Sequence, residues 1–154
     1  MKVQNYKKLK VLFLCTGNSC RSQMAEGWAR HLKPGLIEAF SAGIEAHGLN
    51  PHAVQVMAEA GVDISSQSSK TLSEIGNINF DYVITVCGNA HESCPVFRNP
   101  AVIIHVGFDD PPRLAREMAA RGAGVMAQLE CYRKVRDQIR AFIETLPDSL
   151  PERP

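Results

Sequence analysis

Four short apolar runs set the strongest limit on how this chain can fold. They are Lys10–Cys15, Ile37–Ser41, Tyr82–Cys87 and Val102–Val106. All are rich in β-branched or aromatic residues, nearly continuous in apolar residues, and bounded by Gly, Pro or Asn, which is typical of strands buried on both faces. Because such strands need cover on two sides, the runs predict a parallel sheet with helices on both of its faces.

Helical patterns lie between these runs. Gln23–Leu32 places apolar residues four positions apart, and Pro51–Ala60 follows Asn50 as an N-cap and ends at Gly61. Leu129–Leu146 carries one apolar stripe with charged residues between, the pattern of a packed amphipathic helix. The alternation of strands and helices predicts a three-layer α/β/α fold with a four-stranded parallel sheet.

Composition points to one ordinary globular domain. The chain has 154 residues, of which 45% are hydrophobic and 21% charged, so we expect a single domain over 1–154 with a flexible tail at 147–154. A net charge of +1 without any Lys/Arg block argues against a nucleic-acid surface. The apolar run near the start is too short for a signal peptide or a membrane span. We therefore expect a cytoplasmic protein, and nothing in the sequence demands more than a monomer.

The five cysteines, at positions 15, 20, 87, 94 and 131, bear on function. In a reducing compartment they are expected to be thiols. Any disulfide among them is then transient and functional rather than structural.

The stretch "VLFLCTGNSCRS" ends the first strand in a thiol and follows it with a turn. Gly17 and Asn18 adopt positive φ readily, so the turn can aim successive N–H groups inward as an anion-binding nest. Arg21 adds a planar fork for a tetrahedral oxyanion, and Cys15 below it would be a nucleophile aimed at the central atom. The candidate oxyanion-binding residues are Thr16, Gly17, Asn18, Ser19, Cys20, Arg21 and Ser22.

A Cys and an Arg at this spacing also fit a buried structural thiol beside a surface arginine. The strand before them, the helix after them and the Gly-Asn turn between favour the functional interpretation. The stretch "VLFLCTGNSCRSQMAEGW" resembles the low-molecular-weight protein tyrosine phosphatase superfamily, and is more similar still to the thioredoxin-coupled arsenate reductases of that fold. The resemblance covers about 10–146 and implies Cys15 as the nucleophile in a loop that cradles an oxyanion.

A general acid is expected on another loop, because the leaving oxygen must be protonated. Members of the resembled family carry an Asp-Pro pair after the fourth strand, which matches Asp110 and Pro111 in "VGFDDPPR"; Asp109 is the second candidate. Both aspartates also fit a turn that starts a helix, which does not exclude the catalytic role. The tyrosines that follow this pair in the phosphatases are absent here, where Arg113 and Leu114 stand instead.

Cys87 and Cys94 distinguish a reductase from a phosphatase. Cys87 ends the third strand at the same sheet edge as Cys15. If 88–94 is helical, the Cα atoms of Cys87 and Cys94 lie ~10 Å apart, and a disulfide tolerates at most about 7 Å. Joining them therefore requires that segment to unwind, as in a switch. Zinc binding fits the spacing poorly, and two unrelated thiols are the remaining alternative. The resemblance favours the switch, since the reductases have cysteines at both positions.

The resemblance leads to a relay hypothesis. Cys15 attacks arsenate while Asp110 protonates the departing oxygen, Cys87 then attacks Cys15 and releases arsenite, and Cys94 carries the resulting disulfide to thioredoxin or another thiol reductant. No bound cofactor or metal is required. The main alternative is a phosphatase that works through a cysteinyl-phosphate. A non-catalytic oxyanion-binding or redox-sensing module is a third, against which Cys15, Arg21 and Asp110 together argue.

Four further residues carry weaker interpretations. Cys20 fits either a protective disulfide with Cys15 or simple packing at the start of a helix. Cys131 fits a core position or its margin. By resemblance, Asn18 and Ser41 would hold the loop by side-chain hydrogen bonds.

Overall fold

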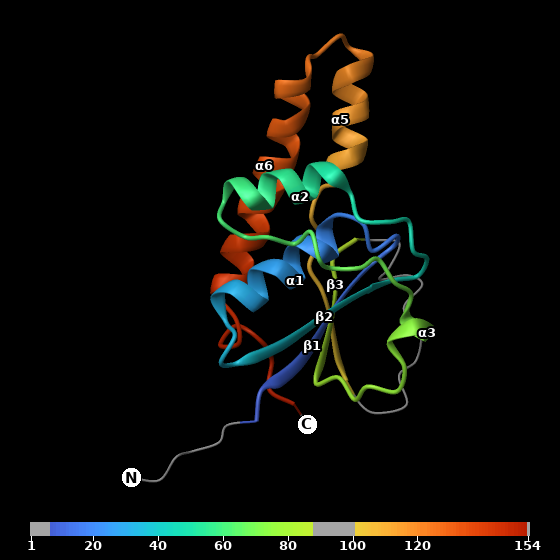
Figure 1. The fold of residues 1–154 in the computed structure, drawn as a ribbon. Coiled ribbons are helices and arrows are strands. Elements are labelled where there is room, and N and C mark those ends of the chain that lie inside the picture. The colour runs from blue at the N-terminus through green and yellow to red at the C-terminus, as the bar shows by residue number, and fades with distance from the viewer. Residues whose placement is uncertain (1–6, 88–100, 154) are drawn as a thin grey trace.

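The computed structural model describes residues 7–87 and 101–153, and it is built on a four-stranded parallel sheet. The strands are β1 (Leu9–Cys15), β2 (Ile37–Gly43), β3 (Tyr82–Thr85) and β4 (Val102–His105), in the spatial order β2-β1-β3-β4. Cys15 pairs with Gly43 at the end of β2, and Leu14 pairs with Thr85 at the end of β3. The carboxyl ends of the strands therefore share one edge (Figure 1). The predicted sheet is confirmed.

Helices flank the sheet, as expected. They are α1 (Arg21–Leu32), α2 (Pro51–Glu59), α3 (Leu72–Ile75), α5 (Pro111–Ala120) and α6 (Val125–Glu144). In Figure 1, α1 and α6 lie on one side of the sheet and α3 on the other. The helix α1 contacts β1 and β2, and it also contacts α2 and α6. The helices α5 and α6 pack against each other and extend beyond the sheet.

Several element bounds differ from the pattern. The strand β3 ends at Thr85, although Val86 and Cys87 remain buried beyond it. The strand β4 is an edge strand with Ile103 45% exposed, so the prediction that all four strands are buried on both faces was wrong for β4. The helix α6 begins at Val125, four residues before the predicted start. The apolar pattern missed its first turn because Val125 and Met126 are exposed and do not belong to the buried stripe.

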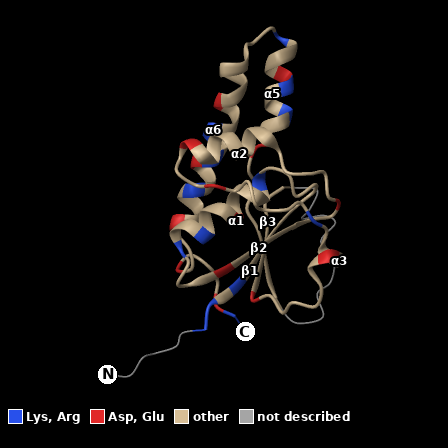
Figure 2. Ribbon diagram, in the orientation of Figure 1, with Lys and Arg blue, Asp and Glu red and all other residues tan. Residues whose placement is uncertain are grey.

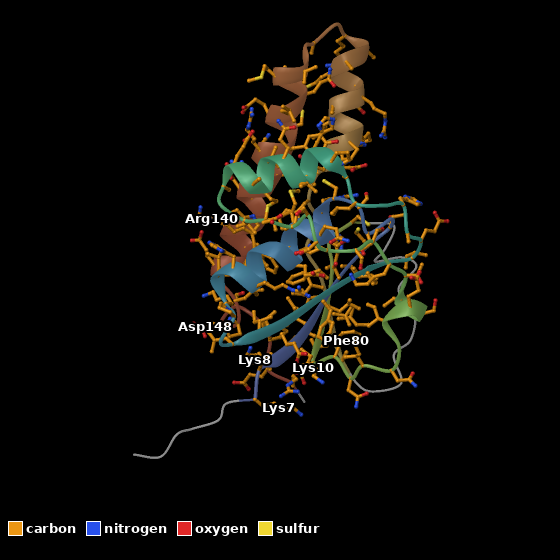
Figure 3. The ribbon with its side chains drawn as sticks, viewed as in Figure 1. Lys7, Lys8, Lys10, Phe80, Arg140 and Asp148 are labelled. Carbon is orange, nitrogen blue, oxygen red and sulfur yellow. The ribbon has the colours of Figure 1, made fainter. Side chains whose placement is uncertain are left out.

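The core forms where α1 and α6 meet above the sheet. Trp28 is almost completely buried, and its indole nitrogen donates to the carbonyl oxygen of Arg136 at 3.1 Å. The Arg140 guanidinium lies 5.0 Å from the centroid of the Trp28 ring, on the outer side of α6 (Figure 3). The buried residues of α6 are Leu129, Tyr132, Val135, Ile139 and Ile143, which confirms the predicted stripe.

The capping prediction for α2 is also confirmed. Asn50 Oδ1 accepts from the N–H groups of His52 and Ala53 at 2.8 and 3.2 Å, and Pro51 occupies the first helical position. Gly61 follows the helix with a φ of 84°, a conformation that glycine adopts without strain. This cap fixes the point at which the chain leaves the oxyanion loop region and enters α2.

Residues 147–153, the described part of the predicted flexible tail, make contacts with the rest of the domain. The Tyr82 hydroxyl donates to the Pro151 carbonyl oxygen at 2.7 Å, and Leu150 packs partly buried against the core. Arg153 pairs with Asp81. The physical reason is that the amino end of the sheet offers apolar surface and a carboxylate, which the returning chain covers and neutralises.

Charge is distributed rather than concentrated. Figure 2 shows basic and acidic residues interspersed along α5 and α6. The lysines Lys7, Lys8 and Lys10 lie together with Asp148 at the amino end of the sheet, away from the end of β1 (Figure 3). None of the helices in the described part of the chain combines the length and apolar character that crossing a bilayer requires.

Candidate functional site

The loop between β1 and α1 lies at the carboxyl edge of the sheet. Cys15 is the last residue of β1 and only 4% exposed, between the ends of β2 and β3. The loop then runs into the N-terminus of α1, whose first N–H groups have no intrahelical acceptors. This is the place in a parallel α/β fold where anions bind.

A neighbouring segment, residues 44–50, turns the loop carbonyls outward. Its N–H groups donate to four loop carbonyl oxygens at 2.9–3.2 Å: Ile44 to Cys15, Glu45 to Thr16, His47 to Gly17 and Asn50 to Ser19. Asn18 has a positive φ of 47°, as its residue type allows. With its carbonyls engaged on the outside, the loop can present N–H groups to an anion on the inside, which is the geometry of a nest.

Two hydrogen-bonding groups contact the sulfur of Cys15. Ser22 Oγ lies 2.8 Å from Cys15 Sγ, and the backbone N–H of Asn18 donates to the same sulfur at 3.2 Å. The Asn18 side-chain amide donates to Ser22 Oγ at 2.9 Å. Donors around a sulfur stabilise negative charge on it, and a thiolate is the nucleophilic form of cysteine.

Arg21 connects the loop to the segment after β4. One guanidinium nitrogen donates to the Phe108 carbonyl oxygen at 3.0 Å, and another lies 3.7 Å from Asp110 Oδ1. The Arg21 side chain is 15% exposed and that of Asp110 34% exposed, so both can still reach a ligand. The predicted oxyanion-binding arginine and the predicted acid are therefore neighbours.

Asp110 immediately precedes α5, so the alternative of a helix-starting turn is also realised. Pro111 occupies the first helical position. The Asp110 side chain makes no capping hydrogen bond to the helix, which leaves its carboxyl group directed to other partners. Asp109, the second candidate, is exposed. The geometry favours Asp110 as the acid.

Cys87 lies against the oxyanion loop. Its sulfur is 3.2 Å from the Thr16 hydroxyl oxygen, and the residue is 4% exposed. Thr16 follows Cys15 directly, so two thiols of the predicted relay come from adjacent strand ends. Cys94, the third, lies outside the described residues.

The other two cysteines differ from these. Cys20 is buried in the loop, and burial raises the pKa of its thiol despite the opposing charge of Arg21. It therefore stays protonated and unreactive at neutral pH, which favours the packing interpretation over a redox role. Cys131 lies between α5 and α6, with its sulfur 3.1 Å from Met118 Sδ. Across residues 7–87 and 101–153, no group of three or more His, Cys, Asp or Glu side chains is placed to hold a metal ion.

The loop's supports were predicted only in part. Asn18 holds the loop through Ser22, as expected, but Ser41 donates to Glu26 Oε1 at 2.7 Å and makes no such bond to the loop. Sequence reasoning missed Gln23, whose buried side chain donates to both the backbone and the side-chain oxygen of Asn18. A glutamine next to the apolar positions of a helix was the only signal of its role.

Taken together, these groups suit chemistry on a tetrahedral oxyanion. The Cys15 sulfur accepts from the Asn18 N–H and lies next to the Ser22 hydroxyl, the Arg21 guanidinium after the same loop neighbours the Asp110 carboxyl group, and a second thiol borders the loop. Such a set can bind an anion, form a covalent adduct on sulfur and protonate a leaving oxygen.

Comparison with known proteins agrees with this geometry. The model of the family described as low molecular weight phosphotyrosine protein phosphatase matches residues 10–153. An arsenate reductase of Bacillus subtilis is 46% identical over 140 residues, which cover 88% of this chain and 95% of that protein. An arsenate reductase of Halalkalibacterium halodurans is 42% identical over 142 residues, with 92% and 97% covered.

Solved structures show the same fold. A structure described as an arsenate reductase in the phosphate binding state superposes with a TM-score of 0.69 at 34% identity, over 93% of this chain and 99% of that one. One described as an arsenate reductase in oxidized state gives 0.71 at 34% identity, over 89% and 95%. The family model spans nearly the whole described chain, and the relatives exceed 40% identity over most of their length. The chain therefore belongs to the low molecular weight phosphotyrosine protein phosphatase family.

Proposed function

We propose that this chain is an arsenate reductase that delivers two electrons from its own thiols and is then reduced by thioredoxin or a similar thiol donor. The observation that carries the proposal is the place of Cys87, whose sulfur lies 3.2 Å from the Thr16 hydroxyl beside Cys15. Hydrolysis of a phosphoester needs one nucleophilic thiol, whereas reduction needs a second thiol to supply the electrons. The arsenate reductases among the relatives support the same activity.

In the first step, the Cys15 thiolate attacks arsenic. A sulfur–arsenic bond forms and one arsenic–oxygen bond breaks, while Asp110 donates the proton with which the departing hydroxyl leaves as water. Arg21 and the inward N–H groups hold the remaining oxygens. Arsenic stays in the +5 state, so this step is a substitution and involves no electron transfer.

In the second step, the Cys87 thiolate attacks Cys15 Sγ. A sulfur–sulfur bond forms, the sulfur–arsenic bond breaks, and its electron pair stays on arsenic, which becomes +3 and leaves as arsenite. Thr16 is placed to hold the attacking sulfur by its hydroxyl. The two electrons come from Cys15 and Cys87, which end as a disulfide.

In the third step, the Cys94 thiolate attacks Cys87 Sγ and releases Cys15 as a thiolate. The Cys87–Cys94 disulfide then accepts two electrons from the dithiol donor by exchange. We place this cycle in the cytoplasm, where such donors are kept reduced. The chain needs no bound cofactor and acts as a monomer in this scheme.

A Cys94→Ser variant tests the relay. With arsenate and excess thioredoxin, it should release one arsenite per chain and then stall with Cys15 bonded to Cys87, which peptide mass spectrometry identifies. The matched control is Cys131→Ser, which changes a thiol between α5 and α6 and should turn over repeatedly. Undiminished turnover of Cys94→Ser would refute the relay.

A phosphatase is the second candidate, because Cys15, Arg21 and Asp110 also suffice to hydrolyse a phosphomonoester and the family model is that of a phosphatase. Thiol counting separates the two activities. A reductase loses two free thiols per chain when arsenate is added to the reduced protein. Unchanged thiols together with rapid hydrolysis of an aryl phosphate would favour the phosphatase.

A further inference from the structure

The side chain of Gln23 occupies a buried polar position behind the oxyanion loop. It lies on α1, two residues after Arg21, and is fully buried. Its Nε2 lies 3.0 Å from three oxygens: the Asn18 carbonyl, the Asn18 side-chain carbonyl and the Ser68 carbonyl. Its Oε1 accepts from Gln67 Nε2 at 2.8 Å. No group in the mechanism described above uses this side chain.

Backbone groups determine which way the side-chain amides of Asn18 and Gln23 point. The backbone N–H of Lys70 can only donate, so the Asn18 side-chain atom 2.9 Å from it must be the oxygen. The carbonyls of Asn18 and Ser68 can only accept, so the Gln23 atom facing them must be the nitrogen. Both amides are thereby oriented by backbone groups whose donor or acceptor character is invariant.

The orientation of the Asn18 amide also determines the direction of the hydrogen bond between Ser22 and Cys15. Because its oxygen faces Gln23 and Lys70, the Asn18 amide must present its N–H to Ser22 Oγ. The Ser22 oxygen is then an acceptor, and its single proton is left to donate to Cys15 Sγ at 2.8 Å. The chain of donors therefore runs from Gln23 through Asn18 and Ser22 to the sulfur.

The same contacts hold the loop conformation. Gln23 donates to the backbone oxygen of Asn18, the residue whose φ of 47° turns the loop. The backbone N–H of Asn18 in turn donates to Cys15 Sγ. An apolar side chain of equal size would leave the buried Asn18 carbonyl without this donor, which is costly. The carbonyl of the exposed Ser68 would keep the Lys70 ammonium group, whose nitrogen lies 2.8 Å from it. If Gln23 only filled space in the core, three acceptor oxygens would not be expected around its Nε2.

We propose that Gln23 is a positioning residue that, together with the Lys70 N–H, holds the Asn18 amide so that Ser22 and the Asn18 backbone N–H both donate to the Cys15 sulfur. It touches neither substrate nor sulfur and acts through Asn18. The inference rests on the proposed function only in taking Cys15 as the nucleophile. Its test uses no arsenate, so its failure is distinguishable from failure of the reductase assignment.

The test is the pH dependence of Cys15 alkylation by iodoacetamide in the reduced full-length protein. Peptide mass spectrometry follows the fragment after Lys10, with fragment spectra that separate Cys15 from Cys20. Gln23→Met keeps the side-chain volume and removes the donor. In this variant the midpoint pH of alkylation should rise by about one unit, so that the alkylation rate at neutral pH falls about tenfold. Gln128→Met, which removes a half-buried amide on α6, is the matched control and should leave the midpoint unchanged.

Two further variants separate positioning from folding. In an Asn18→Ala background, Gln23→Met should shift the midpoint no further, because the path through Asn18 is already broken. Gln67→Met removes the hydrogen bond from the half-buried Gln67 side chain to Gln23 Oε1. This variant should slow Cys15 alkylation at neutral pH at least twofold, and it provides the test if Gln23→Met does not fold. A loss of unfolding free energy with an unchanged midpoint, or additive effects of Gln23 and Asn18, would overturn the proposal.

Discussion

Gly43 is the position where one added methyl group should do the most damage to the site. It ends β2 beside Cys15, and a Cβ built there would lie 2.1 Å from the Glu45 carbonyl oxygen, 2.8 Å from Asn18 N and 2.9 Å from the Gly17 carbonyl carbon. All three are backbone atoms, and ordinary contact begins near 3.4 Å. A Gly43→Ala variant therefore forces the loop and the 44–50 segment apart.

The cost follows from the contacts that must open. Moving the Glu45 carbonyl away disturbs two hydrogen bonds, from Ile44 N–H to Cys15 and from Glu45 N–H to Thr16. Overpacking costs about 1–3 kcal/mol, and each lost hydrogen bond about 1 kcal/mol. We expect the free energy of unfolding to fall by about 3–5 kcal/mol, a large part of the 5–15 kcal/mol that is typical of a domain.

Urea unfolding measures the loss of stability, and the protection of Cys15 by bound phosphate against alkylation measures the damage to the loop. Gly43→Ala should lower the urea concentration at the midpoint of unfolding. It should also abolish the protection that bound inorganic phosphate gives Cys15 against alkylation. Gly35→Ala is the control, because a Cβ there meets nothing within 4 Å. Gly17→Ala is the informative comparison: its Cβ would meet His47 Nδ1 at 2.3 Å, but that side chain is 53% exposed and can rotate away. If Gly43→Ala matched Gly35→Ala in stability and phosphate protection, the steric reasoning would be wrong.

Two more predictions concern other contacts. Thr16→Val removes the hydroxyl 3.2 Å from Cys87 Sγ and should slow formation of the Cys15–Cys87 disulfide about fivefold in single-turnover assays, the rate equivalent of one hydrogen bond of about 1 kcal/mol. The protection of Cys15 by phosphate should be retained. The hydrogen bond from Arg133 lowers the pKa of Glu59, so the stability that this pair contributes is present at neutral pH and is lost as pH falls through the lowered pKa. Urea unfolding of Glu59→Gln should therefore show a deficit at pH near 7 that shrinks below about pH 4, and a deficit independent of pH would contradict this assignment.

The local part of the site could be predicted because it is contiguous. A strand, a Gly-Asn turn and a helix start follow one another within a dozen residues, so residue type alone indicates the nest around Cys15. Cys87 and Asp110 could be placed near it because both follow predicted strands, and the carboxyl ends of parallel strands share one edge. The prediction was wrong at β4, where exposure depends on which neighbours are present, and at Ser41, whose side chain donates to Glu26 rather than to the loop.

By itself, the sequence determined the order of strands and helices, the parallel sheet and the loop that bears Cys15, because each depends on residues adjacent in the chain. Tertiary structure alone decided the contact of Cys87 with Thr16, the 44–50 segment that turns the loop carbonyls outward, and the bonds by which Gln23 holds Asn18. These contacts join elements that meet only after packing, and their donor and acceptor pairing depends on distances of tenths of an ångström. Residue spacing along the chain carries no information of that kind.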